Sequence, residues 1–277
     1  MSAEVEDVVA RALAEDLGSG DVTTAAVVPP GGRARARIEQ RAPGVIFGID
    51  VAGEVFAQAD PELRFEARAE EGAWSEGGEV AAITGAAAGI LAGERVALNL
   101  LGRLSGVATL TARYVRAVEG TGARILDTRK TTPGLRALEK RAVLAGGGFS
   151  HRAGLYDAIL VKENHALLAG GVGEAARRAL AHAGGADWVE VEVETLEELD
   201  EVLVAGVARV LLDNMALAEM SAAVERAYAA GATVEASGGI SLDGIRAIAE
   251  TGVDFISVGA LTHSAPALDL SLVLEPN

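Results

Sequence analysis

The chain has 277 residues, of which half are apolar, and its formal net charge of −16 at pH 7 argues against nucleic-acid binding, which depends on a basic surface. It contains no cysteine, which excludes disulfides, zinc–thiolate sites, iron–sulfur clusters and thiol nucleophiles. The longest uncharged apolar-rich run, residues 80–93, is too short to cross a bilayer, and the acidic N-terminus lacks the pattern of a secretory signal, so we expect a cytoplasmic protein without a membrane or nucleic-acid partner.

The N-terminal part of the chain predicts an α+β domain. Residues 3–16 carry apolar side chains at the spacing of an amphipathic helix, and a loop follows. Short alternating runs with glycine turns over residues 32–84 predict strands, the first of which places its arginines on a solvated face. Residues 87–118 predict a long helix that is interrupted near Gly102 or Gly106.

A regular β/α rhythm begins after residue 120 and predicts parallel strands covered by helices. Its apolar, strand-like runs are residues 124–127, 157–161, 188–193, 207–212, 232–236 and 254–258. These are six repeats, whereas a complete β/α barrel has eight strands. The expected domains are therefore 1–118 and a barrel domain at 119–277, whose extreme C-terminus is expected to pack on the first domain.

Positive charge is concentrated in residues 124–162, where eight basic residues stand against three acidic ones. All three lysines of the chain, Lys130, Lys140 and Lys162, lie in this segment. In an acidic protein such a segment predicts a pocket for a small, multiply anionic ligand, because massed like charges need neutralisation. Exposed charges on a helix would account for only some of these residues. For Lys140 the sequence allows either a side chain that faces the ligand or one that is solvated.

Carboxylates are predicted to lie near this basic segment. Strict alternation in residues 188–194 places Glu190, Glu192 and Glu194 on one strand face, which points into the barrel unless the strand is an edge with its glutamates in water. Interior carboxylates need a cation such as Lys162, Lys130 or a metal ion, or must be protonated. Asp213 ends a neighbouring strand, and two carboxylates beside basic residues suit Mg²⁺ bound together with substrate phosphates.

Small residues in the last two repeats, 236–240 and 258–261, predict backbone contacts to a phosphate group. The glycines at 146–148 and the residues after them form either a mobile flap or a plain loop. A rival interpretation uses Lys162 as a Schiff-base lysine, which would make the protein an aldolase.

Long motifs in a fixed order cover most of the chain: EDLGSGDVTT (15–24), ERVALNLLGRLSG (94–106), DTRKTTPGLRALEK (127–140), GGGFSHRAGLYDAILVKENH (146–165), VEVEVE (189–194), LLDN (211–214), EASGGI (235–240) and ISVGALTHSAPALDLSL (256–272). In these motifs the sequence resembles the quinolinate phosphoribosyltransferases, the carboxylating nicotinate-nucleotide pyrophosphorylases. The resemblance implies an N-terminal α/β sandwich domain and an open, incomplete, six-stranded α/β barrel. It also implies a homodimer or higher homo-oligomer.

The activity implied by the resemblance is the reaction of quinolinate with phosphoribosyl pyrophosphate in NAD biosynthesis, with Mg²⁺, to give nicotinate mononucleotide, diphosphate and carbon dioxide. Carried over by motif, the catalytic residues are Lys130, Lys162, Glu192 and Asp213. The quinolinate carboxylates would contact Arg129, His151, Arg152 and Lys162, with Thr128 and Lys130 beside them and Arg95 entering from a partner subunit. Glu192 and Asp213 would bind the ribose hydroxyls or Mg²⁺, and the 5′-phosphate would contact Ser237, Gly238, Gly239 and Gly259.

Two alternatives remain open at the level of sequence. The first is a related phosphoribosyltransferase that acts on another pyridine acid, such as nicotinate. The second is a non-catalytic relative that binds phosphosugars. Reaction rates with quinolinate and with nicotinate distinguish the first alternative from a quinolinate-specific enzyme. Binding of phosphoribosyl pyrophosphate without release of diphosphate identifies the second.

Overall fold

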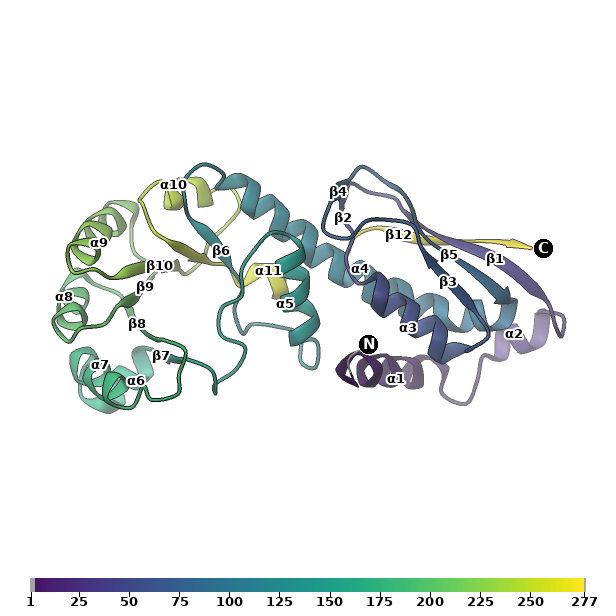
Figure 1. Ribbon diagram of the computed structural model, residues 1–277, viewed down its shortest axis with the longest axis horizontal. Helices are drawn as coiled ribbons and strands as arrows, with labels where there is room; N and C mark the ends of the chain where they lie inside the picture. The colour runs from purple at the N-terminus through teal and green to yellow at the C-terminus, as the bar shows by residue number, and fades with distance from the viewer. Residues whose placement is uncertain (1–2, 277) are drawn as a thin grey trace. The chain divides into compact units, whose positions relative to one another are not determined.

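The computed structural model describes residues 3–276 and contains two compact units (Figure 1). The first, here the N-terminal unit, comprises residues 3–112, 132–147 and 262–276, and the second, here the barrel unit, comprises 113–131 and 148–261. The N-terminal unit contains a four-stranded antiparallel sheet, and the barrel unit contains a six-stranded parallel sheet. The mixed α/β fold class predicted from the sequence is thus confirmed.

The N-terminal sheet has the order β12-β1-β5-β3. Its strands are β1 (Arg33–Gln40), β3 (Arg64–Ala67), β5 (Gly78–Ala86) and β12 (Leu270–Pro276), and a separate short ladder joins β2 (Gly44–Val45) to β4 (Trp74–Ser75). Along β1 the residues alternate, with Ala34, Ala36 and Ile38 buried and Arg33 and Arg35 exposed. This alternation confirms the solvated arginine face.

Five helices of this unit begin before residue 140: α1 (Ala3–Leu17), α2 (Val22–Val27), α3 (Ile49–Ala59), α4 (Ala87–Ala117, whose last turn belongs to the barrel unit) and α5 (Arg136–Ala145). The prediction of α1 is confirmed. Two local predictions were wrong. The expected loop contains α2, because the Asp21 side chain accepts a hydrogen bond from the Thr24 N–H and caps the helix. The expected strand region contains α3, which buries Ile49, Ala52 and Phe56 at helical spacing.

The interruption predicted in the long helix is absent, since α4 is continuous over 31 residues. Gly102 and Gly106 are instead sites of close backbone approach. A Cβ atom at Gly106 would lie 2.0 Å from the Pro266 carbonyl oxygen, and one at Gly102 would lie 3.1 Å from the Leu268 oxygen. The glycines therefore let the segment before β12 pack against the helix. Among the described residues, no helix combines the length and apolar composition needed to cross a membrane.

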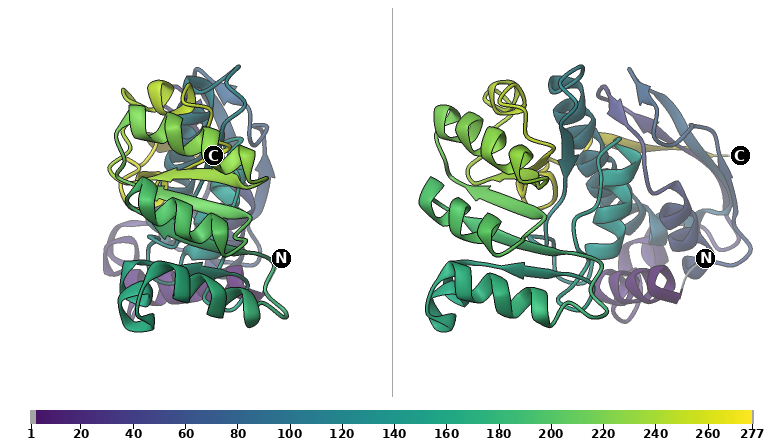
Figure 2. Two further views of the ribbon diagram at one scale, coloured as in Figure 1. Left: turned by 90° about the vertical axis from the view of Figure 1, so that its left-hand side faces the viewer. Right: turned by 60° about the vertical axis from the view of Figure 1, so that its left-hand side comes forward.

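The barrel sheet has the order β6-β11-β10-β9-β8-β7. Its strands are β6 (Arg124–Leu126), β7 (Ile159–Val161), β8 (Val189–Val193), β9 (Arg209–Asp213), β10 (Thr233–Ser237) and β11 (Phe255–Ser257). The connecting helices α6 (Glu163–Ala169), α7 (Val172–Ala181), α8 (Leu196–Val204), α9 (Leu217–Ala229) and α10 (Ile245–Ala249) line its outer face (Figure 2). Because β6 and β7 are edge strands in the described sheet, the predicted open, six-stranded barrel is confirmed.

Alternation along the barrel strands separates two environments. On β8 and β9, Val191, Val193, Val210 and Leu212 are buried and form the apolar layer beneath the helices. The intervening positions carry the charged and polar side chains of these strands, which face the barrel interior. This arrangement gathers the titratable groups of separate repeats into one region.

Candidate active site

A cavity of about 320 Å³ opens among the interior side chains of the barrel unit. It is lined by Thr128, Arg129, Lys130, His151, Arg152, Leu160, Lys162, Leu211, Glu235, Ser237 and Ser257. Most of these residues belong to the segments after β6 and β7 or to the interior positions of β9, β10 and β11. The structure thus brings together all the cationic site residues predicted on the barrel unit. This position agrees with the rule that β/α sheets bind ligands at the carboxyl ends of their strands.

Two arginines place like charge in this cavity. The Arg152 side chain is buried, and its Nη1 atom donates a hydrogen bond to the Ala158 oxygen at 3.1 Å. Burial lowers the pKa of Arg152, and the like charge of Arg129 lowers it further. A guanidinium stays protonated in proteins, so the pair retains its positive charge. The cost of holding the buried Arg152 cation beside the partly exposed Arg129 cation is offset when an anion binds between them.

Lys162 and Glu192 form an ion pair between the end of β7 and the neighbouring strand β8. Lys162 stands immediately before α6, where its N–H donates to the His165 Nδ1 atom at 2.9 Å. Burial raises the pKa of Glu192, Asp213 raises it further, and Lys162 opposes both effects. The predicted pairing of an interior glutamate with Lys162 is therefore confirmed, and Asp213 lies close enough to act on the same carboxylate.

The turn after β10 depends on glycine. Gly238 has φ +95°, and a Cβ atom there would lie 2.2 Å from the Asn214 Oδ1 atom. Asn214 itself has a positive φ of 56°, and its Nδ2 atom donates to Asp213 Oδ2 at 2.8 Å. The turn that carries Gly238 and Gly239 is thereby packed against the turn that carries Asp213. The sequence motif contained Asn214, but its structural role was not predicted.

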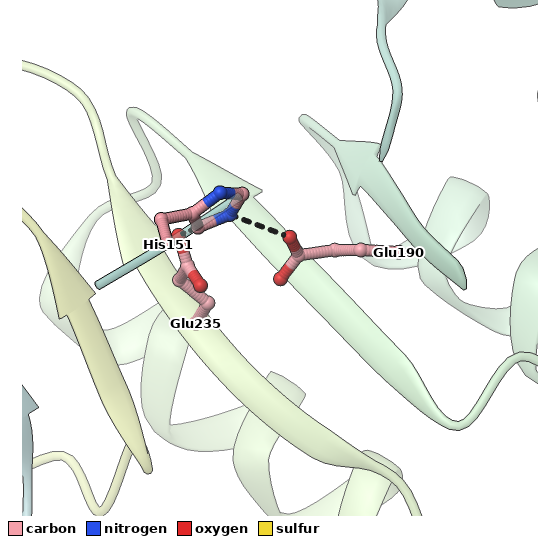
Figure 3. Close-up of side chains that lie close together, drawn as sticks. All are labelled: His151, Glu190 and Glu235. Atoms are coloured by element: carbon pink, nitrogen blue, oxygen red, sulfur yellow. Dashed lines mark hydrogen bonds and ion pairs between the residues drawn. The ribbon is translucent and has the colours of Figure 1, made fainter. Parts of the chain in front are cut away.

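A cluster of charged and polar residues borders the cavity, here called the buried charge cluster and defined as His151, Glu190, Arg209, Glu235 and Ser257 (Figure 3 shows the first two and Glu235). All of them except the partly exposed Arg209 are buried. The Nε atom of Arg209 lies 2.9 Å from Glu190 Oε1, and its Nη2 atom lies 2.6 Å from Glu235 Oε2. His151 Nε2 is 3.0 Å from Glu190 Oε2 and 3.6 Å from Glu235 Oε1. Ser257 donates its hydroxyl proton to Glu235. Two carboxylates are therefore joined by one guanidinium and one imidazole.

Burial changes the protonation of these carboxylates. Burial raises the pKa of Glu235 to about 7, and the charge of Glu190 acts in the same direction. Burial also raises the pKa of Glu190, while Arg209 opposes the change. One carboxyl proton is therefore readily retained within the cluster near neutral pH.

The cluster corrects two predictions made for the alternating glutamates. Glu190 does face the interior, but its cation is Arg209, which was not among the expected partners. Glu194 is exposed and does not share the interior face. The strand ends at Val193, and the Glu194 N–H donates to Glu198 Oε2 as the chain enters α8. Alternation along the strands could have shown that Arg209 and Glu235 face the interior. Arg209 stands four residues before Asp213, and Glu235 stands two residues before Ser237, so each pair shares one strand face.

Several other expected features lie elsewhere. Arg95 is an exposed residue of α4 in the N-terminal unit, so its predicted entry into a neighbouring site stays a prediction. Lys140 is buried on α5, which excludes a solvated charge. Phe149 pairs with Leu126 of β6, so the segment before His151 is held by a strand and does not form a free flap. Gly259 precedes the short helix α11 (Ala260–His263), and its phosphate contact also stays a prediction.

Comparisons with known proteins identify both parts of the chain. Models of the N-terminal and C-terminal domains of quinolinate phosphoribosyl transferase match residues 21–105 and 107–273. The chain is 45% identical over 276 residues to the Mycobacterium leprae nicotinate-nucleotide pyrophosphorylase [carboxylating], with 97% of this chain and 96% of that one covered. It is 42% identical to a probable protein of the same name from Bacillus subtilis, with 93% and 89% covered.

A solved structure gives the same result. The crystal structure of NadC from Streptococcus pyogenes superposes with a TM-score of 0.93 at 39% identity, and the match covers 99% of this chain and 97% of that one. Sequence models and structural similarity thus agree over almost every residue, including the segments that line the cavity. The resemblance noted in the motifs is confirmed, and the chain belongs to the quinolinate phosphoribosyl transferase family.

Proposed function

We propose that this protein transfers the phosphoribosyl group of phosphoribosyl pyrophosphate to the ring nitrogen of quinolinate and removes the adjacent carboxylate, a step of NAD biosynthesis. The products are nicotinate mononucleotide, diphosphate and carbon dioxide. The observation that carries the proposal is the composition of the cavity in a chain of this family. Four cationic side chains line it, and the carboxylates of Glu192 and Asp213 lie beside them. The four cations are Arg129, Lys130, Arg152 and Lys162.

The cations suit a rigid dicarboxylate. Arg129 and Arg152 offer planar forks that match carboxylate geometry, whereas Lys130 and Lys162 act as compact point charges toward carboxylate or diphosphate oxygens. These contacts hold the pyridine nitrogen toward the ribose. They also reduce the entropy cost of bringing the two reactants together. The apolar side chains of Leu160 and Leu211 complete the cavity wall.

In the transfer step, the pyridine nitrogen lone pair forms a bond to C1′ while the C1′–oxygen bond breaks and diphosphate leaves with that electron pair. Positive charge develops on the ribose in the transition state. The carboxylates of Glu192 and Asp213 stabilise this charge because they are fixed before the reaction begins, by Lys162 and Asn214 respectively. Lys130 and Lys162 offset the negative charge of the departing diphosphate.

The alkylated ring nitrogen is cationic and makes the second step possible. The bond between C2 and its carboxylate breaks, the electron pair stays at C2 beside the positive nitrogen, and carbon dioxide leaves. C2 then takes a proton that derives from water. No covalent attachment to the protein is needed, so Lys162 is assigned to charge stabilisation and not to a Schiff base. Its ion pair with Glu192 supports this assignment, because the ammonium group already contacts a carboxylate at the strand ends.

The remaining substrate contacts follow from the turns at the strand ends. We assign the 5′-phosphate to Ser237 and to the backbone N–H groups near Gly238, Gly239 and Gly259, where small residues allow close approach. Thr128 lines the cavity beside the cations.

The donor set at the strand ends fits Mg²⁺. Glu192 and Asp213 offer carboxylate oxygens, the ligands that this ion prefers, and their proximity is supported by the effect of Asp213 on the pKa of Glu192. We propose that these two residues hold the ion, which when bound neutralises charge on the diphosphate.

We further propose a cytoplasmic homodimer or higher homo-oligomer in which Arg95 enters the neighbouring site. The exposure of Arg95 on α4 supports this part of the proposal. A matched pair of inactive variants tests it. Mixing Arg95→Ala protein with Lys162→Ala protein restores part of the activity if each site combines residues of two subunits, and restores none if each subunit works alone.

The test of the proposed activity supplies phosphoribosyl pyrophosphate and Mg²⁺ with either quinolinate or nicotinate, and measures nucleotide and carbon dioxide together. Equal amounts of both products from quinolinate, with none from nicotinate, are expected. Nucleotide formed from nicotinate would instead identify a relative with another acceptor. Binding of phosphoribosyl pyrophosphate without any product would identify a non-catalytic protein.

A further inference from the structure

The buried charge cluster contains two acidic groups and one guanidinium whose placement the proposed reaction does not use. Glu190 and Glu235 are both fully buried, and Arg209 contacts each of them with a different nitrogen. A lysine, as a point charge, could not make this two-pronged contact in the same geometry. The guanidinium also lies between two rings, 4.5 Å from the Trp188 centroid and 4.6 Å from the Phe255 centroid. Arg209 is therefore fixed on several sides.

A metal ion is a poor explanation for this cluster. The nearest ligand atoms of His151, Glu190 and Glu235 lie within 4.8 Å of one another, a spacing that a cation can bridge. Both carboxylates, however, already contact Arg209, and Ser257 also donates to Glu235. A second cation would have to compete with the Arg209 guanidinium, which cannot lose its charge. The cluster is best described as a closed salt-bridge network.

His151 connects this network to the cavity through both of its ring nitrogens. Its Nδ1 atom accepts the backbone N–H of Arg152 at 2.8 Å, so Nδ1 carries no proton. The ring proton therefore sits on Nε2, which donates to Glu190 at 3.0 Å. The His151 backbone N–H donates to Asp127 Oδ1 at 2.8 Å. The imidazole cannot turn without breaking its bonds to Glu190 and to the Arg152 N–H, and Arg152 follows it directly in the chain.

We propose that Arg209 and Glu235 are positioning residues, which hold Arg152 in place for the quinolinate carboxylates through Glu190 and the fixed tautomer of His151. This inference rests on the proposed function. The inference links the network to quinolinate and not to the phosphoribosyl substrate, because the hydrogen bonds of the network connect to His151 and Arg152. The groups assigned to the phosphoribosyl substrate, Glu192 and Asp213, make their own contacts with Lys162 and Asn214.

The test uses two conservative variants, Glu235→Gln and Arg209→Lys, with Arg226→Lys as the matched control. Arg226 forms an exposed ion pair with Asp200 at 2.8 Å on the outer helices of the same unit. In the two network variants we expect the KM for quinolinate to rise roughly tenfold, while kcat and the KM for phosphoribosyl pyrophosphate stay within about twofold. The control should match the wild type in all three constants. Circular dichroism and thermal unfolding establish that each variant is folded.

Nitrogen NMR of protein labelled at its histidines gives a second readout that does not depend on catalysis. The chain has four histidines, so a His151→Gln spectrum assigns the signals of interest. We expect an unprotonated Nδ1 and a protonated Nε2 in the wild type, and a mixture of tautomers in Glu235→Gln. Retention of one tautomer in that variant would contradict the proposed coupling.

The outcomes separate this inference from the proposed function. Absence of nucleotide product from the wild type overturns the proposed function, and the tautomer measurement then decides the coupling of Glu235 to His151. An active wild type with unchanged quinolinate KM in both folded variants overturns the inference alone. An equal rise in both KM values also overturns it, because a general structural defect does not distinguish the two substrates. If Arg209→Lys does not fold, Glu235→Gln decides.

Discussion

Lys162 Nζ and a carboxylate oxygen of Glu192 are paired across the ends of two adjacent strands, so neither side chain can be changed without affecting the other. Glu192 is buried and Lys162 is half-exposed, which makes the lysine the side through which solvent and ligand reach the pair. Substituting Lys162 therefore removes a positive charge from the substrate site and also leaves the Glu192 carboxylate without its ion-pair partner.

For Lys162→Ala we expect kcat/KM to fall by a factor on the order of 10³, because a cation is lost and the neighbouring buried carboxylate is left without its partner. Steady-state rates with quinolinate provide the measurement. Arg178→Ala, which removes an exposed cation paired with Glu174 on α7, is the control and should retain full activity. A folded Lys162→Ala enzyme with a near-normal rate would remove Lys162 from the site.

Replacing Arg152 by Ala should abolish turnover and weaken quinolinate binding by a factor on the order of 10², because a buried fork is removed from the cavity. Calorimetric titration with quinolinate measures the binding without requiring catalysis. Arg152→Lys should recover only part of the affinity, since a point charge replaces a bidentate group. Unaltered binding in either folded variant would contradict the assignment of Arg152 to the carboxylates.

Glu235 predicts an effect of pH on stability. Its pKa is raised to about 7 in the folded protein from the ordinary value of 4.5, so the native state holds more protons than the unfolded state between these values. The free energy of unfolding therefore falls as pH rises from 4.5 to 7, by about 3 kcal/mol from this group. Urea unfolding of wild type and Glu235→Gln at several pH values measures the difference. Parallel stability curves would show that Glu235 does not titrate in this range.

Gly106→Ala tests the close approach between α4 and the segment before β12. Alanine normally favours a helix by about 1 kcal/mol over glycine, yet here its Cβ would lie 2.0 Å from the Pro266 backbone oxygen. We expect a net loss of about 2–3 kcal/mol in the free energy of unfolding, as for other overpacked sites. Gly184→Ala meets no atom within 4 Å and is the control. A stabilised Gly106→Ala protein would contradict the close approach of the Pro266 backbone to α4 at this position.

The sequence predicted the barrel unit well because its local patterns and its tertiary structure agree. Each apolar run forms a strand, the valines of β8 and β9 pack under helices, and polar or charged side chains follow at several strand ends. The parallel arrangement then places Lys162, Glu192, Asp213 and Ser237 along one edge of the sheet without any further information. The long motifs added the identity of the family.

The missed features depend on contacts between distant residues. The pairing of Arg209 with Glu190 and Glu235 joins three strands, and no spacing within one strand specifies it. Gly106 looks like a helix breaker until the Pro266 backbone is placed beside it. The apolar residues of α3 are flanked by short alternating runs, which mask the change from the strand period to the helix period.

The strand β12 has a consequence for the order in which the protein can be completed. Its residues pair with β1 from Ala34 to Gln40, although β1 is made early in synthesis and β12 only after the whole barrel unit. Until β12 emerges from the ribosome, β1 presents an open sheet edge, which is a known route to aggregation. The N-terminal unit is therefore the last to be finished, and shortening the chain before Leu270 would leave that edge permanently uncovered.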